Sequence, residues 1–214
     1  MNFTGHGNKL IEERVIDSNN VKELIKKLKQ IPISSRVARE CIDLAYGFFS
    51  PLNGFMNSKT LTNVCQEMKL LDGILWPIPI LLDMDKDIID KNNLKIGDQV
   101  ILSYQDQPLA LLDIEEIYQY DKLKIAQAVI GTTEEKHPGV LMLNQWSDHF
   151  IAGSIQLINE PRFQPPFDRF WYTPLQLRKI FKKRGWERVI AHQTRNVPHT
   201  GHEWLMKGAW FSAN

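Results

Sequence analysis

The sequence has only two cysteines among its 214 residues, Cys41 and Cys65. So few cysteines exclude a small scaffold held by disulfides and favour a protein of a reducing compartment. Long apolar runs are also absent: the longest, over residues 74–82, is interrupted by two prolines and is too short to cross a bilayer. Residues 1–9 are polar and lack the apolar core of a secretion signal. The sequence therefore predicts a cytoplasmic protein with no membrane partner.

A charge excess is missing as well. The 26 Lys and Arg residues nearly balance the 25 Asp and Glu residues, which leaves a formal net charge of +1. Proteins that bind nucleic acid duplexes usually carry a strongly basic face. The local cluster of Lys22, Lys26, Lys27 and Lys29 has the spacing expected for the solvent side of a helix. Nucleic acid is therefore not an expected partner.

The N-terminal three quarters of the chain has a mixed pattern. Helical spacing of apolar residues predicts a helix over residues 21–28 that starts at Asn20, a helix over 35–46 that Gly47 ends, and a helix over 58–70. Short apolar runs bounded by Gly, Asp or Pro predict strands. These runs are 78–82, 99–104, 109–117, 126–130 and 151–158. They are expected to form a small mixed sheet, and the pattern does not decide between a barrel and an open sheet.

Residues 159–168 contain three prolines and are the best candidate for a linker. The pattern after them is α/β. A helix is expected to begin at Pro174, with Thr173 as its cap, and a short buried strand follows over residues 189–193. A further helix is expected from Pro198. The order of these elements predicts a strand-to-helix turn.

The motif QTRNVPHTGH lies at this predicted turn. A helix N-terminus presents unpaired N–H groups and a positive dipole end, so it attracts phosphates. His199 and His202 lie three residues apart on one helix face and can neutralise charge that grows on a phosphoryl group. Gly201 leaves room for a phosphate beside the backbone. The spacing predicts chemistry at a nucleotide phosphate.

Two residues before the histidine pair favour a small oxyanion as the second substrate. The guanidinium of Arg195 can hold a tetrahedral oxyanion through two parallel hydrogen bonds, and Gln193 lies beside it. Other interpretations remain: HxxH pairs also occur by chance, and His192 could complete a zinc site. Alternation along a strand disfavours zinc, because His192 should point opposite to Gln193 and away from the helix face. No metal ligand is therefore assigned.

The motif at 193–202 resembles the signature of ATP sulfurylase (sulfate adenylyltransferase). Other segments resemble the same family in the same order. GFFSPLNGFM at 47–56 resembles its SPLxGFM block, and WPIPI at 76–80 resembles one of its strands. The segment 131–140 resembles its GTxDxxHPGV block, with Glu134 where Asp is commoner. The resemblance covers nearly the whole chain.

This resemblance implies an α+β part followed by an α/β part. Residues 1–160 would be a PUA-like N-terminal domain that contains a β-barrel, and residues 161–170 a linker. Residues 171–214 would be the truncated start of a Rossmann-like HxGH nucleotidyltransferase domain. Because the family's catalytic domain continues further, we expect the chain alone to be an inactive fragment. The apolar residues of its last helix should then lie uncovered.

The reaction implied by the resemblance is ATP plus sulfate giving adenosine 5′-phosphosulfate and pyrophosphate, with Mg²⁺ bound to ATP and a homo-oligomer at full length. The family pattern assigns catalysis to Thr194, Arg195, Asn196, His199 and His202. It assigns sulfate binding to Gln193 and Arg195, and nucleotide binding to Gln193, Thr194, Asn196, His199, Gly201 and His202. His192 departs from the pattern, since the family usually has Phe there.

Two alternatives stay open. PUA-like folds in other proteins bind RNA, so residues 1–160 could form an RNA-binding module. Other HxGH nucleotidyltransferases use a different acceptor, such as a mononucleotide or a phosphopantetheine-like compound. The Gln193–Arg195 pair favours a small free oxyanion instead.

Overall fold

The computed structural model describes residues 3–16, 18–159 and 165–213. Its contacts divide the chain into two compact units, Met1–Thr173 and Pro174–Asn214. The helices of the first unit are η1 (His6–Asn8), α1 (Ser18–Lys27), α2 (Ser35–Ala45), α3 (Ser58–Glu67), α4 (Lys86–Lys91), α5 (Lys122–Val129), α6 (Pro138–Asn144) and η2 (Asp168–Phe170). Its strands are β1 (Gln30–Pro32), β2 (Gly54–Phe55), β3 (Leu82–Asp83), β4 (Gln99–Tyr104), β5 (Gln107–Gln119) and β6 (His149–Leu157).

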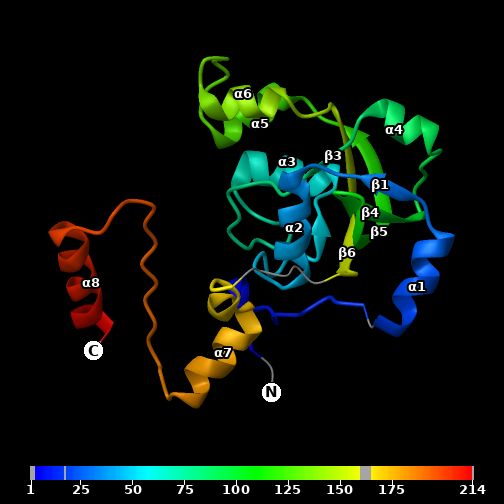
Figure 1. The fold of residues 1–214 in the computed structure, drawn as a ribbon. Coiled ribbons are helices and arrows are strands. Elements are labelled where there is room, and N and C mark those ends of the chain that lie inside the picture. Colours follow the sequence, from blue (N-terminus) through cyan, green and yellow to red (C-terminus); the bar gives the residue numbers. More distant parts are fainter. Residues whose placement is uncertain (1–2, 17, 160–164, 214) are drawn as a thin grey trace. The chain divides into compact units, whose positions relative to one another are not determined.

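The strands of the first unit form one six-stranded mixed sheet (Figure 1). Their order is β1-β4-β5-β6-β2, and β3 pairs with β6 beside this path. Strand β1 runs parallel to β4, whereas the other pairs are antiparallel. Among the described residues no ladder joins β1 to β2, so the sheet is open. The β-barrel of the expected fold class is therefore not found in the part of the chain that the structure describes.

Helices cover both faces of this sheet. In β4, Val100 and Leu102 belong to the main core together with buried residues of α2 and α3. The residue between them, Ile101, packs instead with Val21 of α1 in a second, smaller cluster. This alternation is what a strand buried on both faces requires. Cys41 is fully buried in the main core.

Two predicted strands are wrong. Residues 126–130 lie largely in helix α5, whose N-cap residue Asp121 accepts a hydrogen bond from the Leu123 N–H at 2.9 Å. A short apolar run does not distinguish a strand from a buried helix segment. Here the cap at Asp121 favours the helix. In the run 78–82, only Leu82 enters a strand. Pro79 in this run and Pro77 directly before it have no N–H to offer a ladder, so most of the run stays unpaired.

A partly buried cluster of charges joins α2 to β3. The Arg36 guanidinium donates to Glu40 at 2.7 Å and to Asp83 at 2.5 Å, and it lies 3.9 Å from the centre of the Trp146 ring. Burial raises the pKa of Glu40 from 4.5 to about 7, and the charge and hydrogen bond of Arg36 offset part of this effect. Arg36 also donates to the Leu81 carbonyl, so it keeps partners when Glu40 is neutral.

The raised pKa of Glu40 predicts a pH-dependent stability. The folded state binds the proton more tightly than the unfolded state, so this contribution is fully present below pH 4.5 and is lost as the pH rises through about 7. At pH 8 we expect Glu40→Gln to unfold at a higher urea concentration than the unsubstituted chain, because its free energy of unfolding is larger by roughly 2 kcal/mol. Near pH 4.5 the two chains should unfold at nearly the same urea concentration. The exposed Glu23→Gln is the matched control, and equal curves for both variants would contradict the assignment.

The second unit consists of α7 (Pro174–Lys183), an irregular segment and α8 (Thr200–Ala213). Helix α7 begins at Pro174 as predicted, and Gly185 follows it with a φ of 68°. The strand predicted over residues 189–193 is wrong: the chain there has no regular structure, and about half of the Ile190 side chain is exposed. No helix among the described residues is long and apolar enough to cross a membrane.

Candidate functional site

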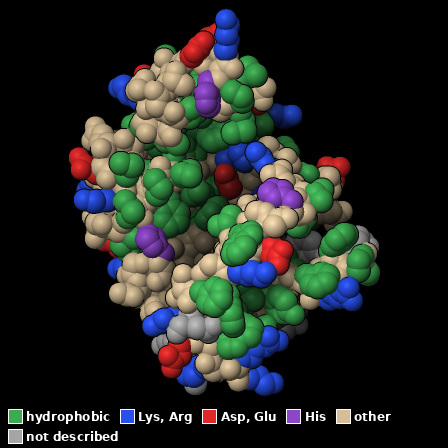
Figure 2. Space-filling view, turned by 90° about the vertical axis from the view of Figure 1, so that its left-hand side faces the viewer, with side chains coloured by type: hydrophobic (Ala, Val, Ile, Leu, Met, Phe, Trp, Pro, Cys, Tyr) green, Lys and Arg blue, Asp and Glu red, His purple; other side chains and the backbone are tan. Residues whose placement is uncertain are grey.

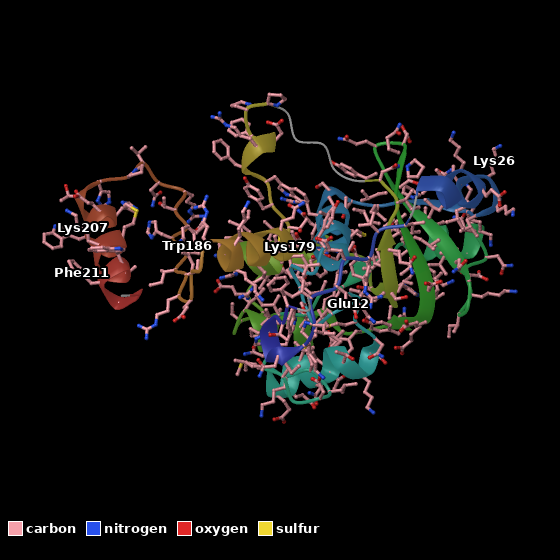
Figure 3. All side chains as sticks on the ribbon, turned by 90° about the horizontal axis from the view of Figure 1, so that it is seen from below. Glu12, Lys26, Lys179, Trp186, Lys207 and Phe211 are labelled. Carbon is pink, nitrogen blue, oxygen red and sulfur yellow. The ribbon has the colours of Figure 1, made fainter. Side chains whose placement is uncertain are left out.

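The residues of the QTRNVPHTGH motif lie at the end of the irregular segment and in the first turn of α8 (Figure 3). His199 comes directly before the first residue of α8, Thr200, and His202 lies in its first turn. All of the motif is exposed except His202, which is partly buried. The expected helix start at this motif is therefore present, whereas the strand before it is not.

Thr194 holds the turn that leads into α8. Its Oγ1 accepts a hydrogen bond from the Asn196 N–H at 3.1 Å and donates to the Asn196 carbonyl at 3.4 Å. The same oxygen lies 3.3 Å from Nε2 of His202. The structure thus brings together three residues that the family pattern assigns to catalysis. The contact between Thr194 and His202 spans eight residues, and helical spacing could not have predicted it.

The two histidines of the motif are in direct contact. Their ring centroids are 4.2 Å apart, and the His202 N–H donates to the His199 carbonyl at 2.9 Å. In the other direction, the His199 N–H donates to Nδ1 of His202 at 3.3 Å. Nδ1 of His199 accepts the Gly201 N–H at 3.1 Å. Both imidazoles therefore satisfy N–H groups that a helix N-terminus leaves without a partner.

Gln193 and Arg195 belong to the same exposed segment. Neither side chain makes a hydrogen bond or ion pair with another residue of the described chain, so the guanidinium keeps all its donors for a ligand. In sequence, Arg195 lies between Thr194 and Asn196, the two residues whose hydrogen bonds form the turn. The role of these two residues in holding an oxyanion stays a prediction.

His192 is a correction to the expected arrangement. Alternation along a strand was expected to turn it away from the helix face, but there is no strand, and its ring centroid lies 5.8 Å from that of His202 at an interplanar angle of 79°. Among the residues that the structure describes, no group of three or more His, Cys, Asp or Glu is placed to hold a metal ion.

The part of α8 that comes after the motif carries large, exposed apolar side chains. Trp204 and Phe211 are each 70% exposed, and Trp210 is 61% exposed. Figure 2 shows many hydrophobic side chains at the surface on the face that it draws. The expectation that the apolar residues of the last helix lie uncovered agrees with these exposures.

Comparison with known families gives two matches along the chain. Residues 3–160 match the PUA-like domain family, and residues 168–214 match the ATP-sulfurylase family. The chain belongs to the PUA-like domain family. It also matches curated sulfate adenylyltransferases over nearly its whole length, which confirms the resemblance found in the sequence.

Three similar proteins illustrate the extent of this match. The sulfate adenylyltransferase of Archaeoglobus fulgidus is 37% identical over 98% of this chain and 51% of the relative. That of Thermococcus onnurineus is 38% identical over 95% of this chain and 52% of the relative. The chain therefore spans about half the length of these relatives. The solved structure of a hexameric APS kinase from Thiobacillus denitrificans covers 98% of this chain and 37% of that chain, with a TM-score of 0.72 and 24% identity, and this likeness concerns the fold.

Proposed function

We propose that this chain supplies the sulfate- and phosphate-binding loop of a sulfate adenylyltransferase. The observation that carries the proposal is the 193–202 motif itself: the exposed Arg195 precedes in sequence the two contacting histidines, His199 and His202, at the start of α8. The match of residues 168–214 to the ATP-sulfurylase family supports it. We further propose that residues from about 171 onward begin a Rossmann-like HxGH nucleotidyltransferase domain.

The reaction would be an in-line displacement at the α-phosphorus of ATP. A sulfate oxygen forms a bond to this phosphorus, the bond to the bridging oxygen of the β-phosphate breaks, and pyrophosphate leaves. Sulfate is already a dianion at neutral pH, so no general base is needed to ionise it. Placement of a poor nucleophile and stabilisation of charge on the phosphates should then supply most of the rate enhancement.

Within this reaction the residues take distinct parts. Gln193 and Arg195 would bind sulfate, because a planar guanidinium matches a tetrahedral oxyanion through two parallel hydrogen bonds. Thr194 and Asn196 would shape the turn and contact the nucleotide phosphates. The histidine pair and Gly201 would receive the phosphate tail at the N-terminus of α8. Mg²⁺ would accompany ATP as the partner of its phosphates.

The partners proposed for the complete protein follow from the same assignment. ATP and sulfate would be its substrates, and it would assemble as a homo-oligomer in the cytoplasm. A net charge of +1 gives no support to nucleic acid as a further partner.

A chimera tests the proposal directly. The chain is joined to the C-terminal half of the Archaeoglobus fulgidus relative, which is the part that it does not match, and pyrophosphate release is measured with ATP and Mg²⁺. We expect release that depends on sulfate and that selenate also supports, since selenate has the same shape and charge. The C-terminal half alone is the control. Release that is independent of sulfate, or that needs a phosphopantetheine-like acceptor, would contradict the proposal.

A further inference from the structure

A groove in the first unit lies between helix α2, the turn that joins β4 to β5, and the two residues that follow β6. We call it the α2 groove, and its volume is about 1120 Å³. A space of this size admits a ligand as large as a nucleotide. Every described residue that lines the groove lies between positions 35 and 159, so the groove is separate in sequence from the motif at 193–202.

Arg39 is the charged group of the α2 groove. Of the described residues that line it, only Arg39 carries a charge. Its Nε–H donates to the Ser35 carbonyl at 3.3 Å, whereas its two Nη groups have no hydrogen-bond or ion-pair partner in the described chain. Burial raises the pKa of Asp43, one turn further along α2, and the charge of Arg39 offsets only part of this effect. The Nη groups therefore stay available to an anion from solution.

The free Nη groups of Arg39 define the anionic end of the ligand. A guanidinium with both Nη groups free holds a phosphate through two parallel hydrogen bonds. One cation matches one anionic group, because further negative charges would have no partner among the described residues that line the groove. A monophosphate therefore fits this charge better than a triphosphate such as ATP.

The rest of the α2 groove is uncharged and presents two kinds of surface. Ile42, Pro108 and Leu109 provide an apolar wall. Gln105 and Gln107 provide side-chain amides, each of which can donate and accept hydrogen bonds. A nucleobase has an apolar face and an edge of donors and acceptors, so it matches both surfaces. The uncharged part of the ligand that fits the groove is therefore a nucleoside.

The turn that carries Gln105 has a backbone conformation that glycine would adopt more easily. The φ angle of Gln105 is 51°, in the left-handed region that costs free energy for a residue with a Cβ. Two-residue hairpin turns usually have Asn, Asp or Gly at such positions. Formation of the turn therefore does not account for a glutamine here, whereas contact of its amide with a ligand would.

We propose that the α2 groove binds a nucleoside 5′-monophosphate, with the phosphate on Arg39 and the base between the apolar wall and the amide of Gln105. This site is additional to the one proposed for sulfate and ATP, and it does not depend on that proposal. It gives the first unit a ligand of its own.

Binding is tested on the 214-residue chain with adenosine 5′-monophosphate as the probe. Backbone NMR follows the titration, and we expect saturable shifts at Arg39, Gln105 and their neighbours. Adenosine and inorganic phosphate, titrated separately, should each bind at least about tenfold more weakly, because each offers only one end of the ligand. Shifts confined to residues 193–202, or equal affinity for adenosine, would overturn the proposal.

Arg39→Gln removes the phosphate contact. It should weaken binding of adenosine 5′-monophosphate about tenfold and leave the weak binding of adenosine unchanged. Arg178→Gln makes the same change on the exposed surface of α7 and should have no effect. Arg39 is itself exposed, so both variants should keep the far-ultraviolet circular dichroism of the unsubstituted chain. Equal affinities of the two variants would show that Arg39 does not hold the phosphate.

Gln105→Gly tests the other end of the ligand. Glycine suits a φ of 51° and keeps the turn, while the amide is lost. We expect the affinity for adenosine 5′-monophosphate to fall about fivefold and that for inorganic phosphate to stay the same. An unchanged affinity for the nucleotide would overturn the placement of the base. None of these measurements needs pyrophosphate release, so a failure here would leave the proposed function standing, and a failure of the chimera would leave this site standing.

Discussion

Arg195→Lys in the chimera is expected to lower kcat/KM for sulfate by about 100-fold or more. A guanidinium presents a rigid fork of donors that fits two oxygens of a tetrahedral anion, whereas an ammonium is a point charge on a flexible stem. Two charge-assisted hydrogen bonds are worth roughly 3 kcal/mol together, and each 1.4 kcal/mol changes a rate tenfold. KM for ATP should change little, since the phosphates are assigned to other residues.

The control for this variant is Arg178→Lys, which makes the same change on the exposed surface of α7. Both variants should keep the far-ultraviolet circular dichroism of the unsubstituted chimera. Steady-state rates at varied sulfate, with ATP saturating, separate the two outcomes. Near-normal kcat/KM in Arg195→Lys would show that Arg195 does not hold the sulfate. In the structure Arg195 is exposed, so a loss of activity would not come from a disturbed core.

Much of the first unit could be predicted from the sequence because its local patterns agree with its packing. The run 99–104 becomes β4 with the expected bounds, and the helix expected over 35–46 becomes α2 over Ser35–Ala45. Here Ser34 caps the helix by accepting the Val37 N–H at 3.3 Å. The choice between barrel and open sheet could not be predicted, because it depends on which strands pair, and periodicity within one strand carries no such information.

The strand expected over 189–193 shows a different limit. Its apolar residues suit a buried strand, but a strand is stable only when another strand satisfies its N–H and C=O groups. Within the described chain no strand lies beside residues 189–193, so their apolar pattern alone does not produce a strand. The predicted orientation of His192 is wrong for the same reason, because it depended on this strand.

The candidate site was predicted in part. The helix start at the motif followed from the sequence, because it depends on local features, whereas the roles assigned to the residues of the motif stay predictions. The contact of Thr194 with His202 did not follow. It depends on how the imidazole turns about its own bonds, and spacing along a helix does not specify this.

Gly54→Ala is expected to destabilise the first unit strongly, although it adds only one methyl group. Strand β2 approaches β6 so closely that a Cβ at Gly54 would lie 1.9 Å from the Gly153 carbonyl oxygen and 2.6 Å from Cα of Ser154. These are backbone atoms, so no side-chain rotation can relieve the overlap, and β2 would have to leave β6. The ladder bond from the Ile155 N–H to the Asn53 carbonyl, at 2.9 Å, would be strained with it. We expect the free energy of unfolding to fall by roughly 3 kcal/mol or more.

Urea unfolding followed by circular dichroism measures this loss, with Gly208→Ala as the control. A Cβ at Gly208 meets nothing within 4 Å, and Ala is favoured over Gly inside a helix by about 1 kcal/mol. Both substitutions add one methyl group. If they change the free energy of unfolding in opposite directions, the difference comes from the nearby backbone atoms at Gly54. An unchanged midpoint for Gly54→Ala would mean that β2 does not lie against β6. The contact between β2 and β6 also positions Met56, whose carbonyl accepts a hydrogen bond from the Tyr118 hydroxyl at 2.8 Å. The loss of stability should therefore extend from the edge of the sheet into the core.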